Sequence, residues 1–446
     1  MDIAKELQDA VTHHTAGRTA EAAAIYRRVL EVDANHPDAL NLLGVIERNN
    51  GNVDVAIELG RKAIAAAPRS AAAHSNLGYS YLAKRAARAA VDQFQQAILF
   101  DPRLTAARDG LRSAQDAHHR SLIAANPVVE LNVEVTTWCN LECQGCGRTV
   151  AMRKDEYGGN RHMSLKTFKK VIDNLPSIPL LNLTGIGETT LQPHLPEMVA
   201  YARSSGKFRT ISFSTNAMAR NLDYYRKCVA AGLTSLIVSV DSLDHEVAQK
   251  MRKGTDVKKL KTRIREFAEL GNVHVETHVT VGRHNLEDVP STVAALAEIG
   301  CLNLSMSRMM GEFDARGYYD PQGICLEAHE MDNFHRVAQE LKAVHGHRFH
   351  SFRIVGFDID KVIRNTKDGS ICGRPISAPA ITVDGLLTPC CVSFDGAHFG
   401  NVSVADMPLA AAYEQPQVRE WLRVFLNGRH PLMCTSCTNN PTLERY

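Results

Sequence analysis

Three cysteines stand close together in the first half of the chain, at Cys139, Cys143 and Cys146, with the spacing C-x3-C-x2-C. A run of apolar and β-branched residues that is typical of a strand, Leu131–Thr136, precedes them. Three thiolates in one short loop can hold three irons of a [4Fe–4S] cluster and leave the fourth iron without a protein ligand. A zinc site would need a fourth ligand, and none is evident in the loop. The spacing therefore predicts a cluster whose open iron can bind and reduce a small molecule.

Six strand-like runs follow one another from residue 131, and segments with helical periodicity separate them. Ser164 is the predicted N-cap of one such helix. Alternating strands and helices predict a parallel sheet with helices outside it. The runs are Leu131–Thr136, Leu180–Thr184, Thr210–Ser214, Ser235–Val240, Val273–Val281 and Leu302–Met306.

A cysteine loop after the first strand of six β/α units resembles the radical S-adenosylmethionine (radical SAM) superfamily. The resemblance implies a TIM-like partial (β/α)6 barrel over residues 128–310, with its chemistry at the C-terminal ends of the strands. It also implies that the open iron chelates the amino and carboxylate groups of SAM. Reductive cleavage then yields a 5′-deoxyadenosyl radical that abstracts hydrogen from a substrate. An external electron donor of the flavodoxin or ferredoxin type is the expected partner.

Polar residues and glycines follow the predicted strands, where the resemblance implies contacts with SAM. Glu188 resembles the acidic residue of the family's GGEP motif, which binds the SAM amino group, although Ile186 and Thr189 depart from that motif. Arg252 is similar to the family arginine that meets the SAM carboxylate. Taken singly, each polar residue is also a candidate helix cap. The expected cofactor-binding residues are Gly185, Gly187, Glu188, Ser214, Asn216, Ser239, Asp241 and Arg252.

A second group of cysteines lies in residues 311–446. Their spacing, with Gly385 between the first two, resembles the SPASM auxiliary-cluster domain, although further cysteines of that domain are lacking. Asp384-Gly385 predicts a hairpin turn. Four cysteines would fully ligate one auxiliary [4Fe–4S] cluster. A zinc site on the same residues, and Cys391 in place of Cys390, stay open as alternatives. The expected ligands are Cys372, Cys390, Cys434 and Cys437.

Four other positions bear on the site. Cys228 and Cys301 are expected to be buried small hydrophobes. Cys325 could face the substrate and donate a hydrogen atom, as epimerase cysteines do, and its alternative is again burial. Gly145 stands where the family commonly has an aromatic residue that stacks on adenine, so adenine packing is expected from elsewhere.

The first 122 residues repeat with a period of 34. Small residues recur at that interval, for example Ala22, Ala56 and Ala90, and Gly44 and Gly78 stand in matching contexts. This period resembles the tetratricopeptide (TPR) repeat, with three units over residues 3–36, 37–70 and 71–104 and a capping helix after them. Such solenoids usually bind a peptide or protein.

Bulk composition narrows the class of protein. The chain has 446 residues, 44% hydrophobic and 22% charged, with a formal net charge of +2, so no nucleic acid or anionic membrane is expected as a partner. Neither a signal peptide nor a transmembrane run is evident. Eleven cysteines without an export signal favour cluster binding in a reducing cytoplasm over disulfides.

We therefore expect a multidomain protein: an all-α TPR solenoid at 1–122, an α/β radical SAM partial barrel at 128–310 and a small α+β SPASM-like domain at 311–446. The leading hypothesis is a radical SAM enzyme that modifies a peptide or protein by crosslinking, epimerisation or oxidation. The alternatives are a dehydrogenase or epimerase of a small molecule such as a sugar or antibiotic, and a non-catalytic redox-sensing scaffold.

Overall fold

The computed structural model describes residues 2–125, 127–149, 159–309, 312–314, 317–319, 323–326, 328–354, 362–363, 371–372, 374–389 and 399–426. It divides into two compact units, Met1–Ala125 and Asn126–Tyr446. We call the first the helical unit and the second the barrel unit. None of the helices in the described part of the chain is long and apolar enough to cross a membrane.

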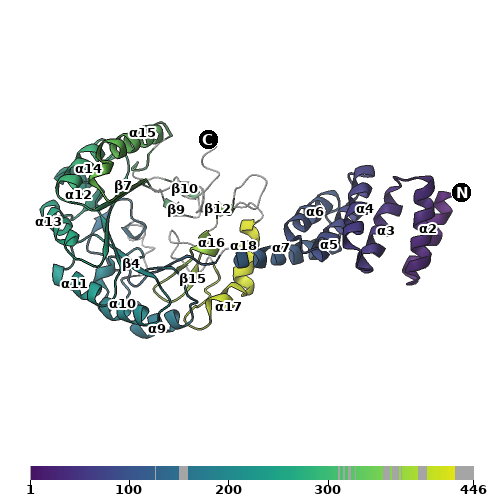
Figure 1. The fold of residues 1–446 in the computed structure, drawn as a ribbon, viewed down its shortest axis with the longest axis horizontal. Coiled ribbons are helices and arrows are strands. Elements are labelled where there is room, and N and C mark those ends of the chain that lie inside the picture. The colour runs from purple at the N-terminus through teal and green to yellow at the C-terminus, as the bar shows by residue number, and fades with distance from the viewer. Residues whose placement is uncertain are drawn as a thin grey trace. The chain divides into compact units, whose positions relative to one another are not determined.

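The helical unit consists of three antiparallel helix pairs and a longer last helix (Figure 1). The residues that recur with the 34-residue period, Ala22, Ala56 and Ala90, are buried where helices cross. The predicted helix pairs are therefore confirmed. The predicted capping helix is also present, and it is longer than the six helices before it. The helices are α1 Ile3–Thr15, α2 Thr19–Val32, α3 Pro37–Asn49, α4 Val53–Ala66, α5 Ala71–Ala83, α6 Ala87–Phe100 and α7 Thr105–Ala125.

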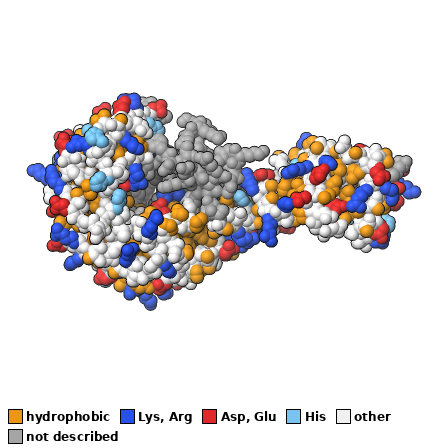
Figure 2. Space-filling model, viewed as in Figure 1, with side chains coloured by type: hydrophobic (Ala, Val, Ile, Leu, Met, Phe, Trp, Pro, Cys, Tyr) orange, Lys and Arg blue, Asp and Glu red, His pale blue; other side chains and the backbone are white. Residues whose placement is uncertain are grey.

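Charges of both signs are interspersed on the face of the helical unit that Figure 2 shows, with hydrophobic side chains between them.

Inside the helical unit, Phe94 of α6 fills the space between α5 and α7. A Cβ atom on Gly78 would lie 2.9 Å from the Phe94 ring, and one on Gly110 would lie 2.4 Å from it. The two glycines thus leave the room that the fully buried ring occupies.

The barrel unit is built on one curved sheet of nine strands in the order β11-β8-β7-β5-β4-β3-β1-β14-β15. All neighbours are parallel except β14 and β15. The strands are β1 Glu130–Val133, β3 Leu180–Asn182, β4 Thr210–Thr215, β5 Ser235–Ser239, β7 His274–Val281, β8 Asn303–Arg308, β11 Ser351–Ile354, β14 Ala380–Ile381 and β15 Leu387–Thr388.

Helices lie in an arc outside this sheet (Figure 1). Side chains alternate along the strands, so apolar residues such as Val279 and Leu304 are buried under the helices while their polar neighbours face the lumen. Ser164 caps α9 as predicted, because its hydroxyl accepts a hydrogen bond from Thr167 N. The helices are α9 Leu165–Asp173, α10 Leu195–Ser204, α11 Leu222–Ala230, α12 His245–Met251, α13 Val257–Ala268, α14 Val289–Glu298 and α15 Ala328–His345.

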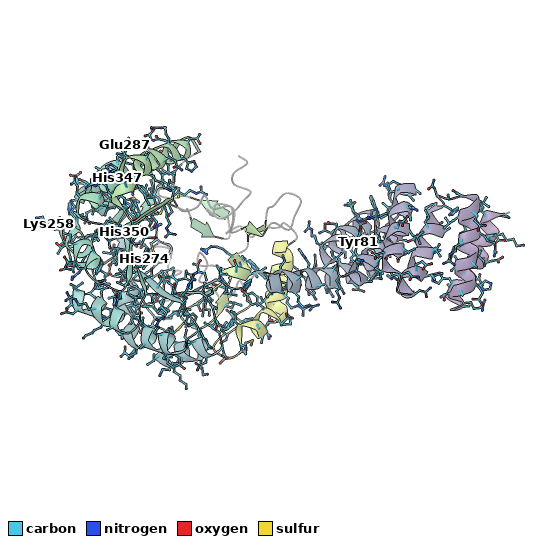
Figure 3. All side chains as sticks on the ribbon, in the orientation of Figure 1. Tyr81, Lys258, His274, Glu287, His347 and His350 are labelled. Atoms are coloured by element: carbon cyan, nitrogen blue, oxygen red, sulfur yellow. The ribbon has the colours of Figure 1, made fainter. Side chains whose placement is uncertain are left out.

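Short elements complete the described part of the barrel unit. Residues His274 and His350, labelled in Figure 3, mark the N-terminal ends of β7 and β11. The short elements are β2 Glu142–Cys143, β6 Arg252–Lys253, β9 Glu312–Asp314, β10 Gly317–Tyr319, β12 Val362–Ile363, β13 Ile371–Cys372, η1 Thr189–Leu191, η2 Gly346–Arg348, α16 Arg374–Ser377, α17 Leu409–Tyr413 and α18 Pro416–Leu426.

All six predicted parallel strands are present, and the hairpin around Gly385 forms as β14 and β15 with Gly385 at φ 83°. The sheet continues beyond them at both edges. β11 extends the edge at β8, and β14 pairs in parallel with β1. Sequence patterns did not predict these pairings, because β11 and β14 are runs of four and two residues, too short to carry a periodic signal of their own.

Replacing Phe94 by Ala should lower the free energy of unfolding of the helical unit by about 3–5 kcal/mol, because the cavity lies in a closed core. The change can be measured by far-UV circular dichroism during urea unfolding of the full chain. Both tryptophans, Trp138 and Trp421, lie in the barrel unit, so tryptophan fluorescence reports that unit separately and should not change. Gln96→Ala, at an exposed position of the same helix, is the matched control. An equal loss in both variants would contradict the packing role of Phe94.

Candidate functional site

The three cysteines of the predicted cluster loop are partly buried and follow the C-terminal end of β1. Burial raises the pKa of the Cys143 thiol to about 12, and the nearby Cys146 and Cys139 thiolates raise it further while Arg252 lowers it. Burial likewise raises the pKa of Cys139. The thiols thus influence one another electrostatically, but no three or more His, Cys, Asp or Glu side chains in the described part of the chain are already arranged to hold a metal ion. Three soft sulfur ligands within one short loop are the donor set of an iron–sulfur cluster held by three cysteines.

Neighbouring strands fix the cysteine loop from two sides. β2 pairs with β6, which places Cys143 opposite Arg252. The Asn216 amide donates to Asn140 Oδ1 at 2.9 Å and lies 4.0 Å from Cys139 Sγ. At the far end of the loop, Arg148 Nε donates to Thr137 O at 3.0 Å. The loop is therefore held by contacts to the ends of β1 and β4 and to β6.

The predicted glycines allow the end of β3 to pack against the end of β1. A Cβ atom on Gly185 would lie 2.3 Å from Glu134 Cγ. One on Gly187 would lie 2.4 Å from Thr136 O and 2.6 Å from Trp138 O, both of which are backbone atoms. Any side chain at Gly187 would push this loop away from the cysteines.

Glu188 joins three segments of the site. Its backbone N–H donates to Trp138 O at 2.6 Å, immediately before Cys139. One carboxylate oxygen accepts from the Thr215 hydroxyl at 2.7 Å and the Thr190 hydroxyl at 2.6 Å, and the other accepts from Asn216 N at 2.7 Å. Only 4% of the residue is exposed. The carboxylate thus caps η1 and holds the end of β4; its contact with a SAM amino group stays a prediction.

Arg252 and Asp241 form a two-point ion pair. Arg252 Nε lies 2.7 Å from Asp241 Oδ2, and Nη2 lies 3.3 Å from Oδ1. Asp241 also accepts from Thr280 N at 3.1 Å. Both predicted cofactor residues therefore lie at the same end of the barrel as the cysteines, and each already neutralises the other. Whether Arg252 also meets a carboxylate of SAM is an untested prediction.

The remaining predicted strand-end residues, Ser214 and Ser239, lie on neighbouring strands and are partly buried. Ser214 N donates to Thr184 Oγ1 at 2.9 Å, which links β4 to the end of β3. Ser239 is paired in register with His278 of β7. All eight predicted cofactor residues thus collect at the C-terminal ends of β3, β4 and β5 and the adjoining β6.

The segment that contains Cys325 packs against the cysteine loop. A Cβ atom on Gly145 would lie 2.7 Å from Ile324 Cδ1 and 2.8 Å from Met309 Sδ. Ile324 O accepts from Arg283 N at 2.8 Å. Apolar side chains from beyond β8 therefore occupy the space beside Gly145, and only 6% of the adjacent Cys325 is exposed. Its role as a hydrogen-atom donor stays a prediction.

The other cysteines divide into two groups. Cys228 and Cys301 are buried, as expected, and Cys301 Sγ lies 3.1 Å from Thr277 Oγ1. The predicted auxiliary-cluster ligands Cys390, Cys434 and Cys437, and the alternative Cys391, lie outside the described residues, and only the backbone of Cys372 is described, on β13. The expected ligand set is therefore retained as a prediction.

Glu134 is a buried carboxyl that the sequence analysis did not single out. Its oxygens accept from Ile186 N at 3.1 Å and from Val383 N at 3.3 Å, so it ties the end of β3 to the β14–β15 hairpin. Burial raises its pKa to about 7, against the lowering effect of the two N–H donors. One sequence signal could have identified Glu134: it is an acidic residue within the first predicted strand, and the alternation of side chains along that strand places it on the lumen face.

Glu134→Gln should change how the stability of the barrel unit depends on pH. A carboxyl whose folded pKa is about 7, raised from 4.5, contributes stability that is fully present below pH 4.5 and is lost as the pH rises through 7. The free energy of unfolding of the wild type should therefore fall relative to that of the variant between pH 5 and 8, by on the order of 3 kcal/mol.

Tryptophan fluorescence during urea unfolding at several pH values measures this difference. The amide cannot accept both N–H groups, so a constant offset is expected, and the slope with pH is the decisive quantity. Glu246→Gln, at an exposed site on α12, should show no such slope. Parallel curves for the wild type and Glu134→Gln would show that Glu134 does not titrate in this range.

Sequence comparisons agree with this geometry. Residues 133–296 match the radical SAM superfamily, residues 10–71 match the tetratricopeptide repeat, and residues 372–438 match the SPASM iron–sulfur cluster-binding domain. The radical SAM match covers the cysteine loop and strands β3 to β7. The SPASM match spans all four expected auxiliary ligands. Domains of these two kinds imply a SAM-binding [4Fe–4S] cluster and an auxiliary iron–sulfur cluster.

Individual relatives match parts of the chain. GTP 3′,8-cyclase of Edwardsiella ictaluri (strain 93-146) is 35% identical over 118 residues, 26% of this chain and 34% of the relative. Fe-coproporphyrin III synthase of Methanosarcina barkeri (strain Fusaro / DSM 804) is 31% identical over 174 residues, 39% of this chain and 41% of the relative. The match spans less than half the length of either relative.

A solved structure shares the fold over a longer range. Streptococcus suis SuiB bound to precursor peptide SuiA matches with a TM-score of 0.52 at 12% identity, over 72% of each chain. The likeness is one of fold, and the three domain matches show that the chain carries, from N- to C-terminus, a tetratricopeptide repeat region, a radical SAM domain and a SPASM iron–sulfur cluster-binding domain.

Proposed function

We propose that the chain cleaves SAM reductively at the Cys139, Cys143 and Cys146 loop and uses the resulting radical to abstract hydrogen from a peptide or protein. The observation that carries this proposal is the position of three partly buried cysteines in one loop after β1, against which Arg252 and Asn216 pack from neighbouring strand ends. A [4Fe–4S] cluster held by these three cysteines, with one open iron, would supply the electron that such cleavage requires.

The residues of the chain would hold and orient SAM. The Gly185–Glu188 loop offers backbone groups beside the cysteines, and Ser214, Ser239 and Asn216 offer neutral hydrogen-bonding groups. The Asp241–Arg252 pair supplies one charge of each sign at the same edge. Met309 and Ile324, which pack beside Gly145, form an apolar surface that excludes water. An external donor of the flavodoxin or ferredoxin type would supply electrons, and Cys372, Cys390, Cys434 and Cys437 would ligate one auxiliary cluster.

Two features support a peptide or protein substrate. Tetratricopeptide repeats commonly bind peptides, and SuiB, which shares the fold, has been solved with a precursor peptide. Crosslinking, epimerisation and oxidation all begin with the same abstraction step. A small-molecule substrate is the second candidate, and it is favoured by the names of the two partial relatives, GTP 3′,8-cyclase and Fe-coproporphyrin III synthase.

Anaerobic reconstitution tests the proposal. The wild type, given iron, sulfide, dithionite and SAM, should form 5′-deoxyadenosine and hold about eight irons, as two cubes require. The Cys139/Cys143/Cys146→Ala triple variant should form none and hold about four irons. Cleavage with only about four irons in the wild type would make the C-terminal site a zinc site. Intact clusters without cleavage would favour the redox-sensing scaffold.

Deleting residues 1–120 separates the two substrate classes. If the helical unit recruits a peptide, the truncated chain should keep SAM cleavage without substrate and lose affinity for the peptide. If the substrate is a small molecule, its turnover should survive the deletion. Unchanged peptide affinity after deletion would contradict the recruitment role.

Gly187→Ala should weaken SAM binding at least tenfold. The new Cβ would clash with two backbone oxygens, Thr136 O and Trp138 O, which cannot move without displacing the main chain before the cysteines. Equilibrium dialysis with labelled SAM measures the affinity, and iron content shows whether the cluster is retained. The matched control is Gly147→Ala in the cysteine loop, where a Cβ would have no neighbour within 4 Å. Equal SAM affinity in the wild type and Gly187→Ala would show that the close contact between β1 and β3 does not shape the SAM site.

A further inference from the structure

A row of polar residues crosses four neighbouring parallel strands at one edge of the sheet, β5, β7, β8 and β11. Ser239 of β5 pairs in register with His278 of β7, which pairs with Ser305 of β8, which pairs with Arg353 of β11. Residues paired in this way lie on one face of a sheet. The flanking residue Val279 is fully buried under the helices, so this row faces the lumen. His278 thus lies beside Ser239, a predicted SAM contact.

Hydrogen bonds connect this row into a relay. The Ser305 hydroxyl donates to Glu276 Oε1 at 2.6 Å, and Arg353 pairs with the other oxygen of Glu276. His278 Nδ1 lies 2.8 Å from Ser305 Oγ, and His278 Nε2 lies 2.9 Å from Ser307 Oγ. Both nitrogens of the imidazole are therefore engaged by serines of β8.

The relay determines which nitrogen of His278 carries the proton. The Glu276 carboxylate, paired with Arg353, can only accept, so the single hydroxyl proton of Ser305 points toward it. Ser305 Oγ must then accept from His278 Nδ1–H. Nε2 of the neutral ring is left as an acceptor, and the Ser307 hydroxyl donates to it. Ser307 Oγ consequently presents its lone pairs to the lumen.

Burial keeps the imidazole neutral. It lowers the pKa of His278, and the cations Arg252 and Arg353 lower it further, while the carboxylates of Asp241 and Glu276 act in the opposite direction. Each of these four charged groups already has an ion-pair partner among the others. The ring can therefore remain in the single tautomer that the relay selects.

The surrounding lumen wall is polar but contributes little unbalanced charge. Partly exposed residues on the same face include the amides and hydroxyls of Asn182, Thr184, Ser214 and Ser239, with the apolar Ile237 between Ser214 and Glu276. Surfaces of this kind bind neutral groups that hydrogen-bond, because a charged ligand would lose its hydration without gaining a counter-ion.

We propose that Ser307 and His278 form a substrate subsite in the barrel lumen that accepts a hydrogen bond from a neutral N–H or O–H group, such as a peptide amide. The subsite rests on the proposed function, because it assumes that the substrate enters the lumen beside SAM. His278 acts on the ligand through Ser307 and is a positioning residue. A carboxylate ligand is disfavoured, since its lone pairs would face those of Ser307.

Nitrogen-15 spectra of the histidine rings in the oxidised holoenzyme test this subsite. His278 is assigned by its loss in His278→Gln. At pH 7 its Nδ1 should be protonated and its Nε2 unprotonated. Added N-acetylglycinamide should shift the His278 signals, whereas acetate should not. Ser307→Ala should weaken the response to the amide about three- to tenfold, as expected for one hydrogen bond. His347→Gln, at an exposed position on η2 (Figure 3), is the matched control and should leave the response unchanged.

A protonated Nε2, a charged ring at pH 7, or an unchanged response in Ser307→Ala would each overturn the subsite. A stronger response to acetate than to the amide would also overturn it. Deoxyadenosine formation by the wild type, measured in parallel, separates the two proposals. If SAM is cleaved but His278 lacks the expected ring state, the subsite is wrong and the proposed function stands. If His278 shows the expected ring state and amide response but SAM is not cleaved, the proposed function is wrong and a binding site for neutral amides remains.

Discussion

The hydrogen bonds of Glu188 are the constraint on which the geometry of the site depends. This one residue connects the loop after β3, the end of β4 and the backbone just before Cys139. A buried carboxylate that lost these donors would be strongly destabilising, so the three segments must assemble together. Gly187 permits the close approach that this assembly requires. The position of the cysteines is thus determined by contacts between strand ends rather than by the cysteine loop itself.

Two acid–base pairs balance charge within the described part of the barrel, whereas the Glu188 carboxylate is held by neutral donors. Asp241 faces Arg252, Glu276 faces Arg353, and the raised pKa of Glu134 favours its neutral form at low pH. Pairing reduces the cost of placing charges in a poorly solvated lumen. Among the described residues it also leaves hydroxyls and amides as hydrogen-bonding groups available to ligands, while both nitrogens of the His278 imidazole are engaged by serines. The same arrangement that makes the interior stable therefore limits the chemistry of what it can bind.

Local patterns were sufficient to predict much of this fold. The 34-residue period predicted the helix pairs, and the six β-branched runs predicted the parallel strands, because both signals repeat along the chain. The pairing of β14 with β1, the buried role of Glu134 and the His278 relay could not be predicted. Each depends on residues far apart in sequence, such as Glu134 and Val383, that become neighbours only when the sheet closes. Glu188 was found by its motif, but the donors to its carboxylate were not: the hydroxyls of Thr190 and Thr215 and the backbone N–H groups of Thr190 and Asn216.

The parallel pairing of β14 with β1 has a consequence for how the barrel unit comes apart. β1 carries the approach to the cysteine loop, and its outer edge is covered by a strand from more than two hundred residues later. Removing that strand would expose the unpaired backbone of β1 and release Glu134 from Val383. The hairpin between the first two predicted auxiliary ligands, Cys372 and Cys390, is thus part of the same cooperative unit as β1. Local unfolding of the β14–β15 hairpin would remove the strand that pairs with β1, and the reverse also holds. Opening of the hairpin should therefore also loosen the cysteine loop that follows β1.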